Sequence, residues 1–403
     1  MLQTGIFNAQ TGNIAELNKR SFSDTILRLF PNGSAPLFAL TGQTGKATAD
    51  SVTHGYFSKT MEFSTLTINN GAGELAADTT LTVDSTAGIV KGMMFHSTRT
   101  RENILVTTVT NATTVEVVRG KGRVAAADLN DDEVLIHIGN AHEQGSGRPT
   151  ARRLSTIHVP NYTQIFRNAW ALTDTARASM AEKGYSNIAE SRSECAMFHA
   201  VDMESAMIWG QASMDTSGGT PMHTTQGIID ALSQYAPTHV QTAGATTNFS
   251  QLEDLLTPSF QYSTDLGNNK ERVLFTGAQG NKVLNDIGRK HANAEMTLQQ
   301  NQMGMLFTSI KTYKGVIHII EHPLFNGVGS DVGSSALVLD LAAIKLAYMR
   351  GRDTKKEEYG VGGSEGGVNG IDAVGGSLTS EFAVEYINPA SGVLINGLTA
   401  GVA

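Results

Sequence analysis

A glycine-rich stretch near the N-terminus contains residue types that can hold a nucleotide phosphate. Residues 40–50 read LTGQTGKATAD, and nucleotide-binding proteins cradle phosphate with a loop of glycine, four residues, then Gly-Lys-Ser/Thr. In this chain Leu40 stands where the first glycine is required, and Ala47 follows Lys46, so no hydroxyl is placed to hold magnesium. We therefore interpret the stretch as part of a flexible arm and not as a nucleotide site.

A second glycine-containing turn lies at residues 275–281, FTGAQGN. It follows a predicted strand and begins a predicted helix, where free backbone N–H groups can bind an anion. Gly277 and Gly280 lack the third glycine of a dinucleotide-binding fingerprint. We interpret the segment as a tight strand-to-helix turn.

Histidine and acidic residues could bind a metal or transfer protons where they share one face of an element. Two such groups exist: Glu194, His199 and Asp202 on a predicted helix, and His318, Glu321 and His322 in or just after a predicted strand. Neither has the His-Glu-x-x-His spacing of a zinc-binding helix, and neighbouring residues of a strand point to opposite faces. We expect these histidines to be structural.

The candidate nucleophiles lack a context that would activate them. No glycine-flanked serine elbow between a strand and a helix is recognised. Cys195, the only cysteine, lies on the apolar face of a predicted helix, where a thiol packs as a small hydrophobic group. Asp131 and Asp132 lie in a predicted turn, and adjacency alone does not make an acid–base pair. The sequence therefore assigns no catalytic, cofactor-binding or metal-binding residue, and it predicts no cofactor.

The composition indicates a soluble globular protein of several parts. The chain has 403 residues, enough for roughly two to four domains. Its net charge of −8 opposes non-specific binding to nucleic acid, which depends on Lys and Arg displacing counterions from phosphate. We recognise no signal peptide at the N-terminus and no stretch long enough to cross a membrane, so we expect no membrane partner.

The first part of the chain predicts an arm followed by a β-rich region. Residues 1–50 are polar and glycine-rich around one short helical candidate, SFSDTILRLF at 21–30. Its apolar residues are too few to form a core, so we expect residues 1–50 to pack on a neighbouring subunit. Residues 64–140 contain short β-branched runs separated by turn sequences, which predicts a small barrel or sandwich with a hairpin turn at TNAT, 110–113.

The remaining chain mixes strands and helices. VPNYTQIFRNAWAL, from Val159, predicts a strand. Residues 186–209 predict a helix about 35 Å long that buries Phe198 and Ile208. Residues 359–377, YGVGGSEGGVNGIDAVGGS, predict a mobile glycine-rich loop. The chain closes with two predicted strands around NPASG.

The order of these elements resembles the major capsid proteins of tailed bacteriophages with the Hong Kong 97-like fold. The resemblance is to the branch that carries a β-domain inserted near the extended loop. Five stretches carry it, in this order: NYTQIF (161–166), WALTDTARASM (170–180), DMESAMIWG (202–210), PMHTTQGIIDAL (221–232), and GRDTKKEEYG followed by EFAVEYINPASGVLINGL (351–360 and 381–398).

The resemblance implies an α+β protomer of the Hong Kong 97-like fold with an inserted small all-β domain. The implied parts are an N-terminal arm at 1–50; an extended loop at 51–65 and 136–158; an inserted β-barrel or sandwich at 66–135; a peripheral domain at 159–235 and 341–403 with a spine helix at 186–209; and an axial domain at 236–340.

The implied function is mechanical and not enzymatic. Copies of the chain would self-assemble into pentamers and hexamers of an icosahedral shell that encloses double-stranded DNA without reading its sequence. The implied partners are other copies of the chain, together with portal, scaffolding and decoration proteins. The implied location is the virion, after assembly in the host cytoplasm.

Two other classes of protein remain open at this point. A hydrolase with an unrecognised site would show a deep pocket with converging polar groups. Another self-assembling surface or appendage protein would also be acidic and β-rich, but it would not need the long helix. A shell protein accounts best for flexible limbs on a rigid body, because many weak contacts add up under closed symmetry.

Overall fold

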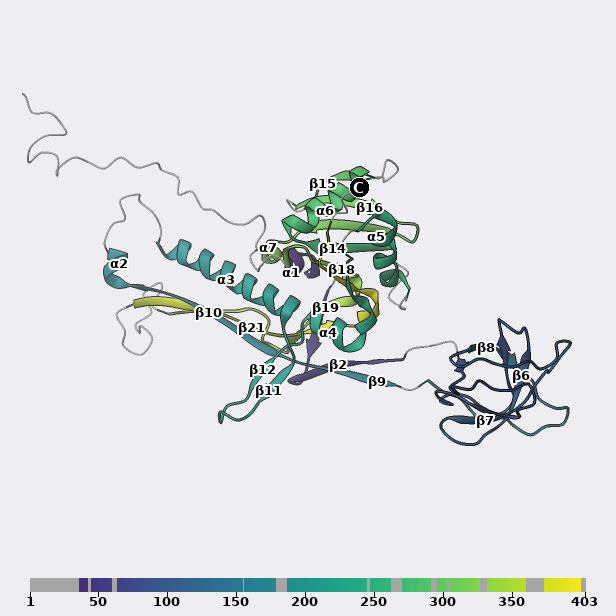
Figure 1. Ribbon diagram of the computed structural model, residues 1–403. Helices are drawn as coiled ribbons and strands as arrows, with labels where there is room; N and C mark the ends of the chain where they lie inside the picture. The colour runs from purple at the N-terminus through teal and green to yellow at the C-terminus, as the bar shows by residue number, and fades with distance from the viewer. Residues whose placement is uncertain are drawn as a thin grey trace, which may run out of the picture. The chain divides into compact units, whose positions relative to one another are not determined.

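The computed structural model describes residues 36–42, 45–59, 64–154, 156–178, 187–244, 247–261, 270–290, 296–302, 305–326, 332–359 and 373–399 (Figure 1). The chain divides into two compact units. The first contains residues 1–56 and 160–403, and the second contains residues 57–159. The first unit contains both helices and strands, whereas the described elements of the second unit are all strands, in agreement with the α+β protomer and β-rich region that the sequence predicted.

The first unit contains a long antiparallel platform, in which the described residues form five strands. Strand β21 pairs along one edge with β10 over ten residues, and along its other edge first with β20 and then with β19. Strand β1 is parallel to β19. The strands are β1 (Lys46–Ala49), β19 (Ile344–Met349), β21 (Ala373–Tyr386), β10 (Gln164–Thr173) and β20 (Lys355–Tyr359).

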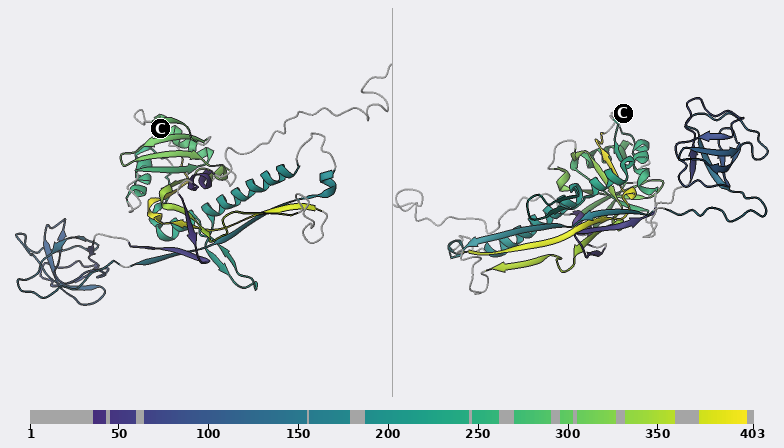
Figure 2. Two further views of the ribbon diagram at one scale, coloured as in Figure 1. Left: turned by 180° about the vertical axis from the view of Figure 1, so that it is seen from behind. Right: turned by 90° about the horizontal axis from the view of Figure 1, so that it is seen from below.

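Helix α3 (Asn187–Trp209) lies along this platform beside β10 and β21 (Figures 1 and 2). Its first half packs Cys195 against Trp170 and Val374. Arg192 lies over the Trp170 ring and forms an ion pair of 2.8 Å with Glu358. The predicted helix is confirmed, and the shorter helix α2 (Asp174–Ala178) precedes it.

The face that α3 buries differs from the expected one. Phe198 is 61% exposed, whereas Ile208 is buried as predicted. The sequence pattern favoured burial of apolar positions, but His199 and Glu204 are buried because hydrogen-bonding partners surround both side chains. His199 bonds to the sheet, and Glu204 bonds to α1 (Pro36–Thr41) and His322. Burial of these two polar residues turns Phe198 outward.

A second sheet of the first unit comprises seven strands among the described residues. They run in the order β13 (Val240–Thr242), β22 (Val393–Asn396), β18 (Ala336–Leu339), β14 (Glu271–Thr276), β17 (Val316–Glu321), β16 (Met305–Lys311) and β15 (Met296–Gln302). Helices α5 (Phe249–Leu256) and α6 (Ala278–Lys290) pack on one core of this sheet through Leu252, Leu256, Leu284 and Ile287.

The C-terminal strand does not lie where the sequence placed it. Residues 341–403 were expected in one part of the protomer, yet β22 joins the seven-stranded sheet between β13 and β18. A 3₁₀ turn at Pro389–Ser391 separates it from β21 of the other sheet. Alternating side chains make this possible, because Leu394 faces one core while Val393 and Ile395 face the other.

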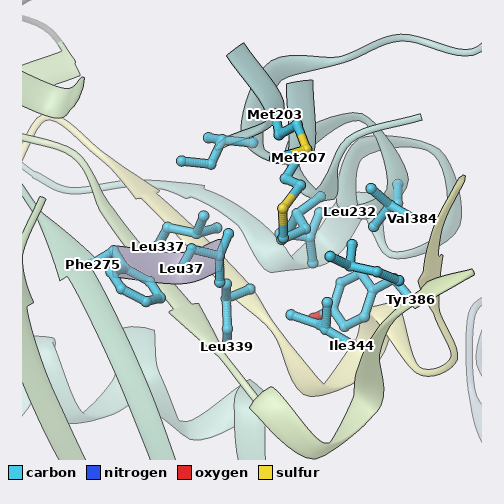
Figure 3. Close-up of a cluster of buried hydrophobic side chains, with 14 of the residues drawn as sticks. Leu37, Met203, Met207, Leu232, Phe275, Leu337, Leu339, Ile344, Val384 and Tyr386 are labelled. Carbon is cyan, nitrogen blue, oxygen red and sulfur yellow. The ribbon is translucent and has the colours of Figure 1, made fainter. Parts of the chain in front are cut away.

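One apolar core joins the two sheets, α3 and the short helices (Figure 3). Leu37 of α1 (Pro36–Thr41) and Leu232 of α4 (Ile228–Tyr235) point into it beside Met207. Phe275, Phe325 of α7 (Pro323–Asn326), Ile344 and Tyr386 complete the contact between the sheets. The shared core fixes both sheets to one helix.

This core corrects the predicted arm. Residues 36–50 were expected to lie on a neighbouring subunit, but Leu37 and Ala49 are fully buried in their own protomer, and β1 extends its sheet. The helical candidate at 21–30 lies outside the described residues.

The predicted mobile loop at 359–377 is also wrong at its ends. Tyr359 belongs to β20 and residues 373–377 belong to β21. A Cβ atom on Gly376 would lie 2.7 Å from the Glu357 carbonyl oxygen and 2.8 Å from Trp170 Nε1. These glycines therefore permit close packing within a sheet. Residues 360–372 lie outside the described residues.

The second unit contains a closed sheet that, within residues 64–154, has six strands. The order is β3 (Thr65–Thr67), β8 (Val134–Asn140), β5 (Met93–Ser97), β6 (Asn103–Val109), β7 (Thr114–Val118) and β4 (Thr80–Thr82). A bridge between Ile68 and Val83 joins the two ends, which makes a barrel. The hairpin turn at 110–113 is confirmed, because β6 and β7 pair on either side of it.

The barrel strands extend past the predicted limits of 66–135, because β8 continues to Asn140. Residues 136–140 were expected in the extended loop. The barrel has an apolar core of its own, which contains Leu66, Leu81, Phe95, Val115 and Leu135. Strands β2 (Thr53–Ser58) and β9 (Ile157–Tyr162) pair as a two-stranded ribbon.

Candidate assembly elements

The order of elements around residues 40–50 is the reverse of a phosphate-binding loop. Helix α1 precedes Gly45 and strand β1 follows it, whereas the phosphate loop lies between a strand and a following helix. Lys46 Nζ pairs with Asp353 at 2.5 Å and lies 4.8 Å from the Tyr348 ring centroid. Lys46 therefore stabilises the contact between β1 and the other strands of its sheet.

The turn at 275–281 joins β14 directly to α6, as predicted. The backbone N–H of Ala278 at the helix start donates to Asn326 Oδ1 at 2.6 Å. A Cβ atom on Gly280 would lie 2.0 Å from Thr276 Oγ1, so only glycine fits there. The glycines of this turn therefore allow β14 and α6 to pack closely.

His199 is a buried structural residue, as expected. Its Nδ1 lies 2.6 Å from Asn168 Oδ1, and its Nε2 lies 2.8 Å from Ser380 Oγ. Asn168 donates its amide to Asp202, which orients its oxygen toward the histidine. Burial lowers the pKa of His199, although Asp202 opposes the shift. The residue joins α3 to β10 and β21 in its neutral form.

His322 and Glu204 form a fully buried pair that joins three elements. His322 Nε2 lies 2.7 Å from Glu204 Oε1, and the same carboxylate accepts the backbone N–H groups of Leu37 and Phe38 at 2.8 and 2.6 Å. The N–H of Leu324 approaches His322 Nδ1 at 3.2 Å, so Nδ1 accepts and Nε2 carries the proton. The pair fixes α1 and the end of β17 to α3. His318 lies within β17, four residues earlier, and does not join this pair.

The remaining chemical candidates are dispersed. Cys195 is 4% exposed and burial raises the pKa of its thiol, which opposes nucleophilic reactivity. Asp131 accepts the backbone N–H of Asn70 in a barrel turn. Among the described residues, no three His, Cys, Asp or Glu side chains are arranged to hold a metal ion. No helix in the same residues is both long and apolar enough to cross a membrane.

Three sequence stretches that carry the capsid resemblance meet in one hydrogen-bonded cluster. Asn161 accepts the N–H of Gln226 at 2.7 Å and donates to the carbonyl oxygens of Gln226 and Val384 at 3.2 and 2.6 Å. Thr225 accepts the N–H of Val384, while its own N–H donates to Gln164. The cluster fixes the turn before α4 onto β9, β10 and β21. Asn161 and Thr225 therefore have positioning roles that sequence analysis did not assign.

A buried ion pair stabilises the barrel. Glu102 accepts Nε and Nη2 of Arg119 at 2.7 and 2.9 Å, and it also accepts the N–H groups of Gly120 and Ala127. Burial acts to raise the pKa of Glu102, but Arg119 and the two backbone donors together lower it below its ordinary value. Arg119 further donates to the carbonyl oxygens of Leu75 and Ala127. Sequence analysis missed this pair, because neither residue shows a local pattern.

The barrel also has an apolar outer surface, which we call the barrel apolar face. Val134, Ile136 and Ile138 point outward from β8 and are 47%, 45% and 49% exposed. Met94 lies opposite Leu105, and Leu105 lies opposite Val118, so the surface continues across β5, β6 and β7. The run VLIHI, apolar on both faces of a strand, is the sequence signal for it.

A second exposed element is the hairpin of β11 (Ser213–Asp215) and β12 (Met222–Thr224), which follows α3. Met214 and Met222 are 53% and 64% exposed. Met214 pairs with His223 and Met222 with Asp215, so the two methionines lie on opposite faces of the hairpin. A two-stranded hairpin is only marginally stable alone in water, so burial of either face against another surface would stabilise it. The arrangement offers contact surfaces for another protein.

Comparison with known proteins gives two extensive sequence matches. The model of the SU10 major capsid protein family matches residues 5–399. The major capsid protein of Pseudomonas phage PaMx41 is 48% identical over 405 residues, which cover 98% of this chain and 96% of that protein.

Solved structures give weaker similarity. The capsid of a native GTA particle has a TM-score of 0.47 and 9% identity, covering 98% of this chain and all of that chain. A Mycobacterium phage Cain structure has a TM-score of 0.46 and 10% identity, covering 97% of both chains. Because both TM-scores are below 0.5, assignment to a family rests on the sequence matches alone.

Proposed function

The chain belongs to the SU10 major capsid protein family, and from this premise we propose that its copies form the pentamers and hexamers of an icosahedral shell around double-stranded DNA. As a major capsid protein it is a structural component of the virion and not an enzyme. The observation that carries the proposal is the 48% identity to a phage major capsid protein over nearly the whole of both chains.

The proposed architecture is Hong Kong 97-like. The α3 platform and the first part of β21 would form the peripheral domain with its spine helix. The seven-stranded sheet, now including β22, would form the axial domain. The β2–β9 ribbon would be the extended loop, and the barrel would be the inserted domain. Residues 1–35 would be the N-terminal arm.

The division into a rigid body and exposed limbs supports this proposal. The Glu204–His322 pair and the Asn161 cluster hold the body together through buried hydrogen bonds between distant parts of the chain. The barrel apolar face and the β11–β12 hairpin leave apolar side chains exposed. In a shell, these surfaces would gain burial from neighbouring copies, and many such weak contacts add up under closed symmetry.

The scaffolding, portal and decoration partners remain predictions. The acidic chain supports enclosure of DNA without tight binding, because a net charge of −8 gives little counterion-release affinity for phosphate.

Sedimentation velocity of the purified full-length chain over a range of concentrations tests the proposal. We expect a fast boundary whose mass is many times that of the 42.8 kDa chain, in equilibrium with pentamers or hexamers. Exchanging Ile136 for Glu on the barrel apolar face should weaken the fast boundary, whereas Thr108→Glu, also exposed on the barrel, should not. A chain that stays monomeric at every concentration would contradict the proposal.

A further inference from the structure

The exposed side of α3 carries an apolar patch that lies between two carboxylates along the helix. Phe198 is 61% exposed, and Met197 and Val201 beside it are half-buried. Glu194 and Asp202 are exposed and stand four residues before and after Phe198, which places them next to it on the helix surface. Asp202 lies at the edge nearest the sheet, where it accepts the Asn168 amide at 2.7 Å, so Glu194 is the carboxylate on the fully outward side. We call Glu194, Met197, Phe198, Val201 and Asp202 the α3 outer face.

The chain itself contains a segment of complementary chemistry. Residues 19–30, KRSFSDTILRLF, contain four apolar side chains within the last five positions. Three basic residues against one Asp make the segment positive, so it complements the two carboxylates of the α3 outer face. These residues precede the described part of the chain, and their apolar side chains are too few to form a core alone.

The point where the described chain begins brings this segment within reach. The first helical residues, Leu37 and Phe38, donate their N–H groups to Glu204 on α3. Glu204 is six residues from Phe198, about 9 Å along the helix axis at 1.5 Å per residue. Five residues lie between Phe30 and Pro36, and the six Cα-to-Cα steps between the two span up to about 20 Å when extended. The intervening sequence PNGSA favours a turn, so the segment can return along the same helix.

We propose that residues 26–30 dock on the α3 outer face of their own chain. Ile26, Leu27, Leu29 and Phe30 cover Phe198 and Val201, and Arg28 lies beside the carboxylate of Glu194. This contact lies within one protomer, so it does not depend on shell assembly and can fail or succeed independently of it.

Thiol crosslinking between defined positions tests the docking. Leu27→Cys and Val201→Cys are combined in a Cys195→Ala background of the full-length chain, and a short bismaleimide is added to a mixture of unlabelled and ¹⁵N-labelled protein. The proposal predicts a crosslink between the two cysteines in which both peptides carry the same label. Peptides of mixed label would show that a neighbouring copy supplies the segment and would overturn the intrachain docking. Absence of any crosslink would overturn the docking itself.

A matched control pairs Leu27→Cys with Ser250→Cys, an exposed position on α5. The proposal predicts at least about tenfold less crosslinking for this pair, and equal crosslinking would indicate undirected collision.

Proteolysis gives a second readout without added cysteines. Trypsin cleavage after Arg28 should be at least about tenfold faster in Phe198→Ser than in the unmodified chain, because loss of the apolar anchor frees the segment. Phe57→Ser, which removes a phenylalanine that is 72% exposed in the second unit, should leave the rate unchanged. Since Phe198 is mostly exposed, its replacement should not unfold α3, and an unaltered melting curve checks this. Equal cleavage rates in Phe198→Ser and the unmodified chain would contradict the proposal.

Discussion

Replacing Arg119 with Met should selectively destabilise the barrel. Arg119 and Glu102 side chains are 4% and 0% exposed, so the change leaves a buried carboxylate without its counter-ion. It also leaves the carbonyl oxygens of Leu75 and Ala127 without the guanidinium donor. Removal of one partner of a buried ion pair costs about 3–5 kcal/mol. A domain of this size is stable by about 5–15 kcal/mol, so the loss is a large part of the total.

Hydrogen exchange measured by mass spectrometry can follow the barrel inside the full-length chain. The expected loss corresponds to roughly 10²–10⁴-fold faster exchange in peptides of β5, β6 and β7, since about 1.4 kcal/mol is a factor of ten. Residues 57–159 contain no Trp or Tyr, and both tryptophans, Trp170 and Trp209, belong to the first unit. The melting temperature of the first unit, followed by tryptophan fluorescence, should therefore be the same in Arg119→Met as in the unmodified chain.

Two further variants separate buried charge from simple loss of a side chain. Arg123→Met removes an exposed arginine of the same barrel and should leave exchange unchanged. Adding Glu102→Gln to Arg119→Met removes the unpaired charge and should restore at least tenfold protection. If Arg119→Met exchanges like the unmodified barrel, or if the double variant is no better protected than the single one, the reasoning about the buried pair is wrong.

Three further changes test the first unit by tryptophan-monitored unfolding. Asn161→Ala should lower the free energy of unfolding by about 3 kcal/mol, because it leaves buried hydrogen-bonding partners at Gln226 and Val384 unsatisfied. Ser213→Ala on the exposed hairpin should leave this free energy almost unchanged. Equal stabilities of the two variants would contradict the role of the cluster. Burial lowers the pKa of His199, so below its ordinary value the unfolded chain binds a proton that the folded chain does not. The free energy of unfolding should therefore fall as pH drops from about 6.5 toward 5. His199→Gln should reduce the dependence of this free energy on pH, and an unchanged dependence would contradict the reasoning. Gly376→Val should cost about 2 kcal/mol or more, because its Cβ meets Glu357 and Trp170, while Gly218→Ala, with open space around it, should be tolerated; a stable Gly376→Val variant would refute the packing argument.

Local sequence patterns predicted the positions of helices, strands and turns better than they predicted which side chains of these elements are buried and what they contact. The helix predicted at 186–209 and the hairpin turn predicted at 110–113 were found because periodicity and turn chemistry are local properties. The strand predicted from Val159 is divided in the structure into β9, which ends at Tyr162, and β10, which begins at Gln164. Phe198 was misplaced because the buried face of α3 is set by Asn168, Ser380 and His322, which are distant in sequence and satisfy His199 and Glu204.

The glycines show the same limit. Gly375 and Gly376 were predicted to be mobile because they lie in a glycine-rich stretch. Their role depends instead on Trp170 of the paired strand β10, whose carbonyl oxygen lies close to Gly375 and whose side chain lies close to Gly376. Likewise, the chain passes from β21 in one sheet to β22 in the other, where the alternating side chains of β22 fill two cores. The four residues of β22 alone do not reveal this placement.

Negative-stain electron microscopy of the purified, overexpressed full-length chain tests the central proposal most directly. The account predicts closed shells of uniform diameter with five-fold and six-fold clusters of subunits on their surface. Dispersed single protomers or open, irregular aggregates, under every condition of salt and concentration, would contradict it.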